Sequence, residues 1–242
     1  MRLPTSILAS AVLVLSLTGF ARASEPDDAK LPIVGKYLDA SRVQRDVMRG
    51  AQMEMDIDAK LPKLEKQGQL RVLRIISRLG KISFKTLGFT GDNTIKNEVI
   101  ARYLAIERDD HASSEIAITP AHYKFRLSAI LTEGSQKYYI FQLTPRKKKV
   151  GLFKGEIWLD SRTGMPVREA GQWVKSPSIF IKKIKFVQEF ELKDGVSVPA
   201  HIESTVDTRI AGRAELSINF SNYTYQALDL GSDIVDEDSP GH

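Results

Sequence analysis

The chain has 242 residues, of which 42% are hydrophobic and 27% charged. This composition is typical of a globular protein and excludes disordered, collagen-like and polytopic membrane classes. The 35 Lys and Arg residues against 30 Asp and Glu give a formal net charge of +5, and there are 4 histidines and no cysteine. So small an excess of positive charge argues against nucleic acid as a partner. Without cysteine, the fold depends on core burial and not on disulfide bonds.

The first 23 residues have the pattern of a secretory signal peptide. Arg2 precedes an uncharged run with an apolar centre, ILASAVLVLSL, and the small residues Ala21 and Ala23 follow it with the spacing of a cleavage site. Several Ser and Thr residues make the run poorly suited to span about 30 Å of hydrocarbon as a permanent anchor. We expect cleavage after Ala23 and a periplasmic mature protein that begins with an acidic leader, 24–33.

The next part of the chain is predicted to contain two helices and three strands. Apolar residues recur at helical spacing in Val34–Val47 and again in Asn93–Glu107. Between these helices apolar residues recur at every second position, which is the spacing of a strand. The predicted strands are Ala51–Ala59, whose polar positions are mostly acidic, and the meander pair Gln69–Arg78 and Lys81–Phe89.

From Tyr123 onward the pattern is entirely that of strands. Apolar and polar residues alternate, and turn residues interrupt the alternation at regular intervals, which favours one antiparallel sheet that is strongly curved or closed. The predicted strands are Tyr123–Leu131, Lys137–Thr144, Glu156–Asp160, Met165–Val174, Ile179–Leu192, Ser197–Thr208 and Ala214–Tyr225. We expect a single domain over 34–228, followed by an acidic, disordered tail over 229–242.

The segment VGLFKGEIWLDSRTGMP, from Val150 to Pro166, follows a basic run and carries the E-I-W-L-D and T-G-M-P elements of a hairpin. With the order of the other predicted elements, it resembles the LolA-like periplasmic lipoprotein-sorting family over about Lys36–Tyr225, and within it a subfamily of exported proteins distinct from the dedicated carriers. The resemblance implies a mainly β fold, a half-open antiparallel β-barrel with a helical lid on its concave face and a cavity for acyl chains. In the dedicated carriers an arginine under the lid holds it closed, and no arginine of this sequence aligns with that role.

The apolar strand faces are the candidate ligand site. Two helices cannot cover a sheet of about ten strands, so the surplus apolar surface either forms a packed core or lines a cavity. Methionine side chains adapt to varied apolar ligands, which favours the cavity. The candidate cavity residues are Met53, Met55, Ile57, Phe84, Phe125, Leu127 and Phe186. The candidate lid residues are Leu38, Ile95, Val99 and Tyr103.

Catalytic and metal sites have little support in the sequence. There is no G-x-S-x-G motif, and His111, His122 and His201 are scattered. The cluster Asp109-Asp110-His111, with Glu115 beyond it, lacks the spacing of a helical zinc site and indicates a solvated loop. The acids of the first strand share a solvated face and do not form an acid–base pair. We therefore expect that the protein is not an enzyme and that it binds neither a metal ion nor a cofactor.

The expected function is binding of an acyl chain or of the lipid anchor of a lipoprotein in the periplasm. The alternative is a periplasmic sensor or interaction module that regulates a membrane partner. Two basic patches, Arg146–Lys149 and the group Lys182, Lys183 and Lys185, are either solubilising loop tips or contacts for an anionic membrane surface or an envelope membrane protein. Neither patch has the interleaved aromatic residues that stack on nucleic-acid bases.

Overall fold

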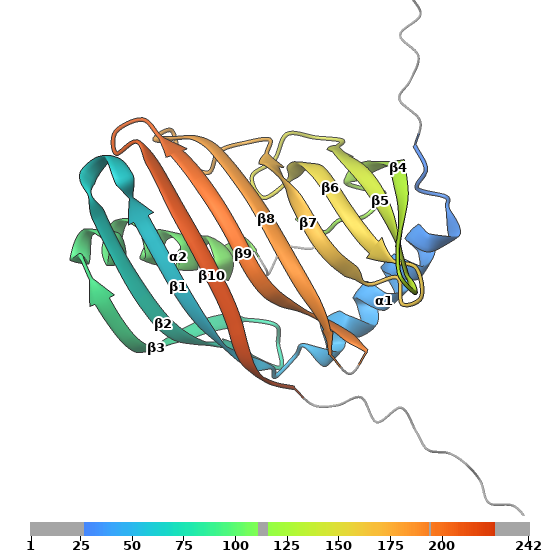
Figure 1. Ribbon diagram of the computed structural model, residues 1–242, viewed down its shortest axis with the longest axis horizontal. Coiled ribbons are helices and arrows are strands. Elements are labelled where there is room, and N and C mark those ends of the chain that lie inside the picture. The colour runs from blue at the N-terminus through green and yellow to red at the C-terminus, as the bar shows by residue number, and fades with distance from the viewer. Residues whose placement is uncertain (1–26, 111–115, 194, 226–242) are drawn as a thin grey trace, which may run out of the picture.

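The computed structural model describes residues 27–110, 116–193 and 195–225. These residues form a few helical segments and ten strands (Figure 1). The helical segments are α1 (Pro32–Val47), the 3₁₀ turn η1 (Pro62–Leu64), the π-helix η2 (Ile95–Ile100) and α2 (Ala101–Asp110). The strands are β1 (Gln52–Leu61), β2 (Lys66–Ile76), β3 (Ile82–Gly91), β4 (Tyr123–Glu133), β5 (Gln136–Pro145), β6 (Phe153–Asp160), β7 (Pro166–Trp173), β8 (Ile181–Lys193), β9 (Val196–Thr208) and β10 (Arg213–Thr224).

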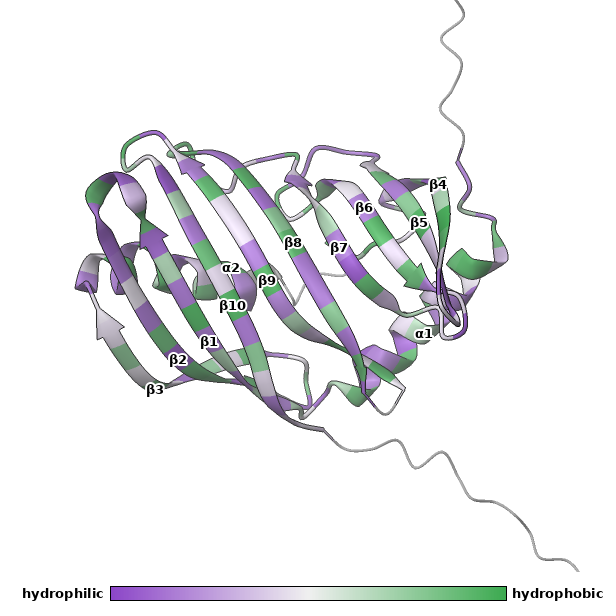
Figure 2. Ribbon diagram, in the orientation of Figure 1, coloured by the Kyte–Doolittle hydropathy of each residue, from purple (hydrophilic) through white to green (hydrophobic). Residues whose placement is uncertain are grey.

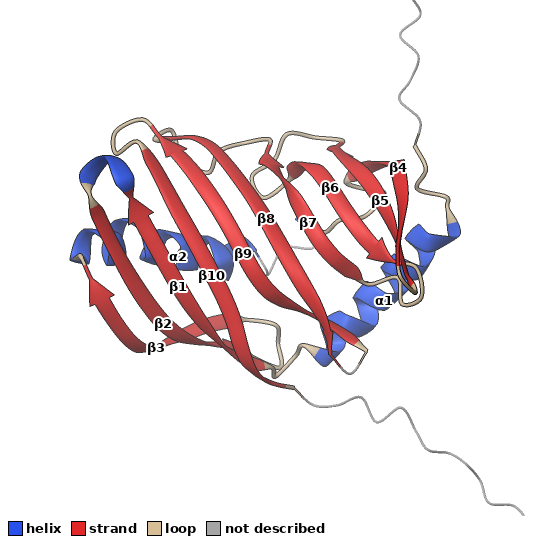
Figure 3. Cartoon of the chain, viewed as in Figure 1, coloured by secondary structure: helices blue, strands red, loops and turns tan. Residues whose placement is uncertain are grey.

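All ten strands of the described residues belong to one antiparallel sheet, in the order β3-β2-β1-β10-β9-β8-β7-β6-β5-β4. The first and last strands of this order are edges, so the curved sheet stays open. Both helices lie on the same, concave face of the sheet (Figures 1 and 3). The predicted fold class, a half-open antiparallel barrel with helices as a lid, is confirmed.

The second predicted helix is not a regular α-helix throughout. Residues 93 and 94 are α-helical, the π-helix η2 follows them, and the helix is α-helical again from Ala101. Backbone hydrogen bonds in a π-helix join residues five apart. Ile95 and Ile100 have that spacing, and neither side chain retains exposed surface. The wider turn therefore brings both isoleucines onto the sheet.

Two large apolar clusters lie on the concave face and share no residue, and a small third cluster joins Val47 of α1 to Val196 and Val198 of β9. The α2 cluster lies under η2 and α2, and the α1 cluster lies under α1. The buried residues of the α2 cluster are Met55, Ile57, Ala59, Leu61, Leu70, Val72, Ile95, Ile100, Leu104, Ile202, Ala214, Leu216 and Ile218. Those of the α1 cluster are Ile33, Val34, Tyr37, Tyr123, Phe125, Phe141, Leu143, Leu152, Phe153, Ile157 and Leu159.

The convex face of the sheet carries mainly polar side chains. On β1, Asp56 lies on the convex side and accepts a hydrogen bond from Arg71 Nε of β2 at 2.8 Å. Its neighbour Met55 lies on the concave side and is fully buried. Along many strands the hydropathy alternates in the same way (Figure 2). The period of two in the sequence therefore reports which face each residue takes.

Part of the expected acidic leader is integrated into the fold. Asp27 Oδ1 accepts a hydrogen bond from Phe125 N at 3.2 Å, and Asp28 Oδ2 accepts one from Leu127 N at 2.8 Å. Both bonds attach the segment before α1 to the edge strand β4. The predicted signal peptide with its cleavage site at Ala23, and the predicted acidic tail, lie outside the described residues.

Candidate functional site

An ion pair is buried between α2 and the sheet. Arg74, on β2, has only 5% of its surface exposed. Its Nε lies 3.5 Å from Oε2 of Glu107 on α2, and its Nη1 donates a hydrogen bond to the sulfur of Met53 at 3.6 Å. The guanidinium group therefore connects α2 to β1 and β2 beside the α2 cluster.

Tyr103 lies one helical turn before Glu107 and adds a second polar group to this contact. The Tyr103 hydroxyl and Arg74 Nε are both buried, and the Glu107 carboxylate interacts with each of them. Burial, and then the charge of Glu107, hold the pKa of Tyr103 well above its ordinary value. A buried ion pair is often no more stable than apolar residues of the same volume.

The contact of α1 with the sheet is of a different kind. Lys36 Nζ donates to the carbonyl oxygens of Ser161 and Arg162 in the β6–β7 turn. A Cβ at Gly164 in that turn would lie 2.8 Å from Cγ of Lys36, so helix and turn are in close contact. At the other end of α1, Gln44 Oε1 accepts a hydrogen bond from Ser197 N at 3.3 Å. These bonds anchor α1 along its length.

The structure divides the predicted cavity residues between the two clusters. Met55 and Ile57 are buried in the α2 cluster, where Phe84 packs against them, and Met53 is buried beside Arg74. Phe125 is buried in the α1 cluster, and Leu127 and Phe186 pack against it. The predicted lid residues divide in the same way: Ile95, Val99 and Tyr103 join the α2 cluster and Leu38 joins the α1 cluster. Whether these residues line a ligand cavity stays a prediction.

Arg74 and Glu107 were not among the residues predicted for the site. The sequence does indicate that Arg74 is buried, because Arg74 alternates in phase with the apolar residues Leu70 and Val72 of the same strand. A charged residue at an apolar position of an alternating strand needs a partner in the interior. Glu107 carries no such signal, since it stands near the end of an amphipathic helix.

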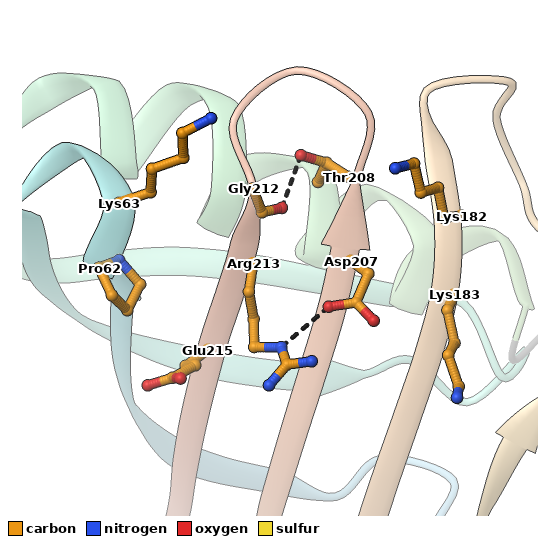
Figure 4. Close-up of a pocket in the computed structure, with 9 residues that line it drawn as sticks. All are labelled: Pro62, Lys63, Lys182, Lys183, Asp207, Thr208, Gly212, Arg213 and Glu215. Atoms are coloured by element: carbon orange, nitrogen blue, oxygen red, sulfur yellow. Dashed lines mark hydrogen bonds and ion pairs between the residues drawn. The ribbon is translucent and has the colours of Figure 1, made fainter.

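An open groove of about 720 Å³ lies on the sheet near the starts of β8 and β10 (Figure 4). Arg213 Nε donates to Asp207 Oδ1 at 2.9 Å in this groove. This hydrogen bond, with the charges of Arg213, Lys183 and Lys185, lowers the pKa of Asp207 below its ordinary value. The groove therefore contains several bases and two carboxylates, of which Asp207 is paired with Arg213 and Glu215 is the other.

The histidines take packing or surface positions where they are described. His122 Nδ1 lies 2.9 Å from the carbonyl oxygen of Ala117. His201 lies on the convex face between Asn219 and Glu203, whose hydrogen bonds outweigh burial and raise its pKa. His111 and Glu115 of the acidic cluster lie outside the described residues. Among those that are described, no group of three or more His, Cys, Asp or Glu could hold a metal ion, and no helix has the length and hydropathy to span a membrane.

No protein-family model and no curated protein matches the sequence. Among solved structures, a DUF1329 family protein from Desulfovibrio piger is 14% identical with a TM-score of 0.41, over 81% of this chain and 93% of that one. The LolA superfamily protein NE2245 from Nitrosomonas europaea is 10% identical with a TM-score of 0.36, over 79% and 94%. A putative outer membrane lipoprotein-sorting protein domain from Vibrio parahaemolyticus is 13% identical with a TM-score of 0.37, over 78% and 92%.

The last two of these names are those of the family that the sequence resembles. The likeness is distant in both sequence and superposition, with identities of 10% to 14% and TM-scores of 0.36 to 0.41. We therefore base the functional proposal on the side chains of the chain itself.

Proposed function

We propose that the chain is a non-enzymatic periplasmic protein that binds an acyl chain, free or as the lipid anchor of a lipoprotein, between the concave face of the sheet and α2. The observation that carries this proposal is the buried ion pair of Arg74 and Glu107 under the helix. A buried ion pair contributes little net stability to the fold, because desolvation offsets the attraction of the charges. It nevertheless gives α2 a polar contact that can break and form again. Such a contact suits a helix that opens and closes.

Opening of α2 would uncover the faces of β1, β2 and β10 that form the floor of the α2 cluster. The buried residues of this floor are aliphatic side chains and Met55, whose flexible thioether adapts to ligands of varied shape. Each acyl methylene buried there would contribute about 0.8 kcal/mol. Arg74 would lose Glu107 as its partner on opening, and a carboxylate or an ester carbonyl of the lipid can accept its hydrogen bonds in exchange.

Titration of a fluorescent fatty acid tests the proposal. We expect micromolar binding to the wild type and weaker binding to Phe84→Gln, because Phe84 packs against the α2 cluster from the edge strand β3. Leu87→Gln is the matched control, since Leu87 is an exposed residue of the same strand. Phe84 is only partly buried, so its substitution should cost less than the about 3–5 kcal/mol typical of a buried Phe truncation.

A wild type that binds no acyl probe, and whose melting temperature does not change with lipid, would contradict the proposal. The alternative, a sensor or interaction module, would then stand. For the location, we expect N-terminal sequencing of the exported protein to begin at Ser24. Recovery of intact Met1 in a membrane fraction would contradict both export by cleavage and a freely diffusing carrier.

A further inference from the structure

One rim of the sheet gathers several loops that are distant in the sequence. Because neighbouring strands are antiparallel, the ends of β1, β5, β7 and β9 lie at the same rim as the starts of β6, β8 and β10. This rim is the upper edge of the sheet in Figure 1. It consists of η1, the β5–β6 loop (146–152), the β7–β8 loop (174–180) and the β9–β10 loop (209–212). We call these four segments the loop rim.

Large apolar side chains are exposed on three segments of the loop rim. Ile179 is 79% exposed and Ile210 is 75% exposed, and Phe180 and Leu64 are also exposed. These four make up a large part of the exposed large hydrophobic residues in the described chain. Exposed apolar residues that gather in one place mark an interaction surface more often than scattered ones do.

Contacts between the loops make these apolar residues one surface. Arg209 donates from its backbone N to Phe180 O at 2.9 Å and from Nε to Ile179 O at 2.8 Å. A Cβ at Gly212 would lie 3.1 Å from Cδ of Lys63, which brings the β9–β10 loop against η1. The apolar tips are therefore held beside one another.

Positive charge surrounds the apolar tips. Four exposed bases lie on the same segments or beside them: Lys63, Lys175, Lys182 and Arg209. The groove of Figure 4 adds Lys183. Among the acidic residues near the rim, Glu65 is exposed and Glu215 lines the groove, and three others are paired with bases. Asp207 is paired with Arg213, Asp92 with Lys66 and Asp27 with Arg146. The next loop along the rim adds the exposed Lys147 and Lys148.

We infer that the loop rim docks on an anionic lipid bilayer, with Ile179, Phe180, Ile210 and Leu64 inserted at the head-group boundary and the bases against lipid phosphates. Apolar residues flanked by Lys and Arg are the pattern of interfacial membrane binding. The bases extend along a whole edge of the sheet, which matches a planar charged surface better than the compact charge cluster of one acidic protein. Docking by this rim would leave α2 and the concave face free to exchange a ligand.

Co-sedimentation with vesicles tests this inference. We expect the purified protein to bind vesicles of phosphatidylglycerol and phosphatidylcholine, to release them in high salt, and to bind pure phosphatidylcholine at least tenfold more weakly. The double variant Ile179→Ser/Ile210→Ser should lower binding at least tenfold. Lys63→Gln/Lys182→Gln should lower it about 25-fold, because each base near an anionic surface contributes roughly fivefold.

The matched control is Leu79→Ser/Lys81→Gln at the opposite rim. Leu79 is 86% exposed and Lys81 is also exposed, so the control removes the same kinds of side chain from the β2–β3 turn. Binding of the control should equal that of the wild type. Absence of vesicle binding, equal binding to neutral vesicles, or an equal loss in the control would overturn the inference. Phe84→Gln should bind vesicles like the wild type, so a failure of the acyl site and a failure of the rim are distinguishable.

Discussion

The two helices on the concave face make opposite kinds of contact with the sheet. Under α1, Tyr123 is buried, and its hydroxyl accepts a hydrogen bond from Phe153 N at 3.2 Å. Under α2, the Tyr103 hydroxyl is also buried, and its polar neighbour is the partly exposed carboxylate of Glu107. The α1 cluster is rich in aromatic residues in contact, such as Phe125 and Phe141, whose ring centroids lie 5.9 Å apart. The buried residues of the α2 cluster are aliphatic side chains and one methionine.

The comparison indicates which helix moves. α1 has hydrogen-bonded anchors at Lys36 and Gln44 and a preceding segment attached to β4. The helical segment of η2 and α2 has fewer such contacts with the sheet: Lys66 Nζ of β2 donates to Thr94 Oγ1 at its start at 2.8 Å, and Arg74 and Glu107 form a pair near its end at the long distance of 3.5 Å. Local opening takes least free energy where hydrogen bonds and close packing are fewest. We therefore interpret α1 as a fixed cover and α2 as the lid.

Truncation in the α1 cluster should have the largest effect on stability and the smallest on ligand binding. Phe141 is fully buried, so Phe141→Ala should lower the free energy of unfolding by about 3–5 kcal/mol. Urea unfolding measures this loss. Acyl-probe affinity of the folded variant should stay within about twofold of the wild type. A large loss of affinity would show that the ligand site extends under α1.

Breaking the ion pair should destabilise the packing of α2 on the sheet and leave that of α1 unchanged. Glu107→Gln leaves Arg74 buried without a counter-charge. We expect the free energy of unfolding to fall by somewhat less than the roughly 3–5 kcal/mol that breaking a fully buried pair costs, because the Glu107 side chain is 18% exposed. Hydrogen exchange should accelerate in α2 and remain unchanged in α1. The control is Glu98→Gln, which breaks the exposed pair with Arg102 on the same helical segment and should cost about 0.3–0.5 kcal/mol.

The double variant Arg74→Leu/Glu107→Leu sharpens the same comparison. Replacement of both partners by apolar residues should recover the lost stability or exceed it, and α2 should then exchange more slowly than in the wild type. If the pair is a switch, acyl-probe uptake should slow as well. Normal uptake by this stabilised variant would show that α2 does not need to open.

Loss of an anchor should loosen α1 without any effect on α2. Lys36→Met removes the bonds to the β6–β7 turn and should lower stability by about 1 kcal/mol, the usual net contribution of a hydrogen bond. Hydrogen exchange should accelerate in the first turns of α1. Equal acceleration in both helices would contradict the division into a fixed cover and a lid.

The smallest expected effect is a pH dependence of the segment before α1. Burial raises the pKa of Asp27, but hydrogen bonds from Phe125 N and Arg146 outweigh it and hold the pKa below the ordinary value of 3.8. A lowered pKa means that the stabilisation is present above that value and is lost as the pH falls through the folded-state pKa. The protection of Phe125 N, relative to the intrinsic exchange rate at each pH, should therefore fall in acid below pH 3.8, and Asp27→Asn should show this lower protection already at neutral pH.

The alternation of apolar and polar residues was sufficient to predict most strands and the face that each side chain takes. In β1, for example, the period of two separates Met55 from Asp56. Helical spacing predicted both helices, although not the π-helical start at Ile95. These features depend on residues within one element, and periodicity reports the environment of one element at a time.

Tertiary structure decided the features that involve distant elements. β1 pairs with β10, so the last strand lies inside the sheet and β3 and β4 become its edges. Arg74 and Glu107 meet only because α2 folds back over β2, and the apolar tips of the loop rim become neighbours only when the sheet is complete. The pattern within one segment cannot specify such contacts, because pairing and burial of charge depend on the free energy of the whole assembled sheet.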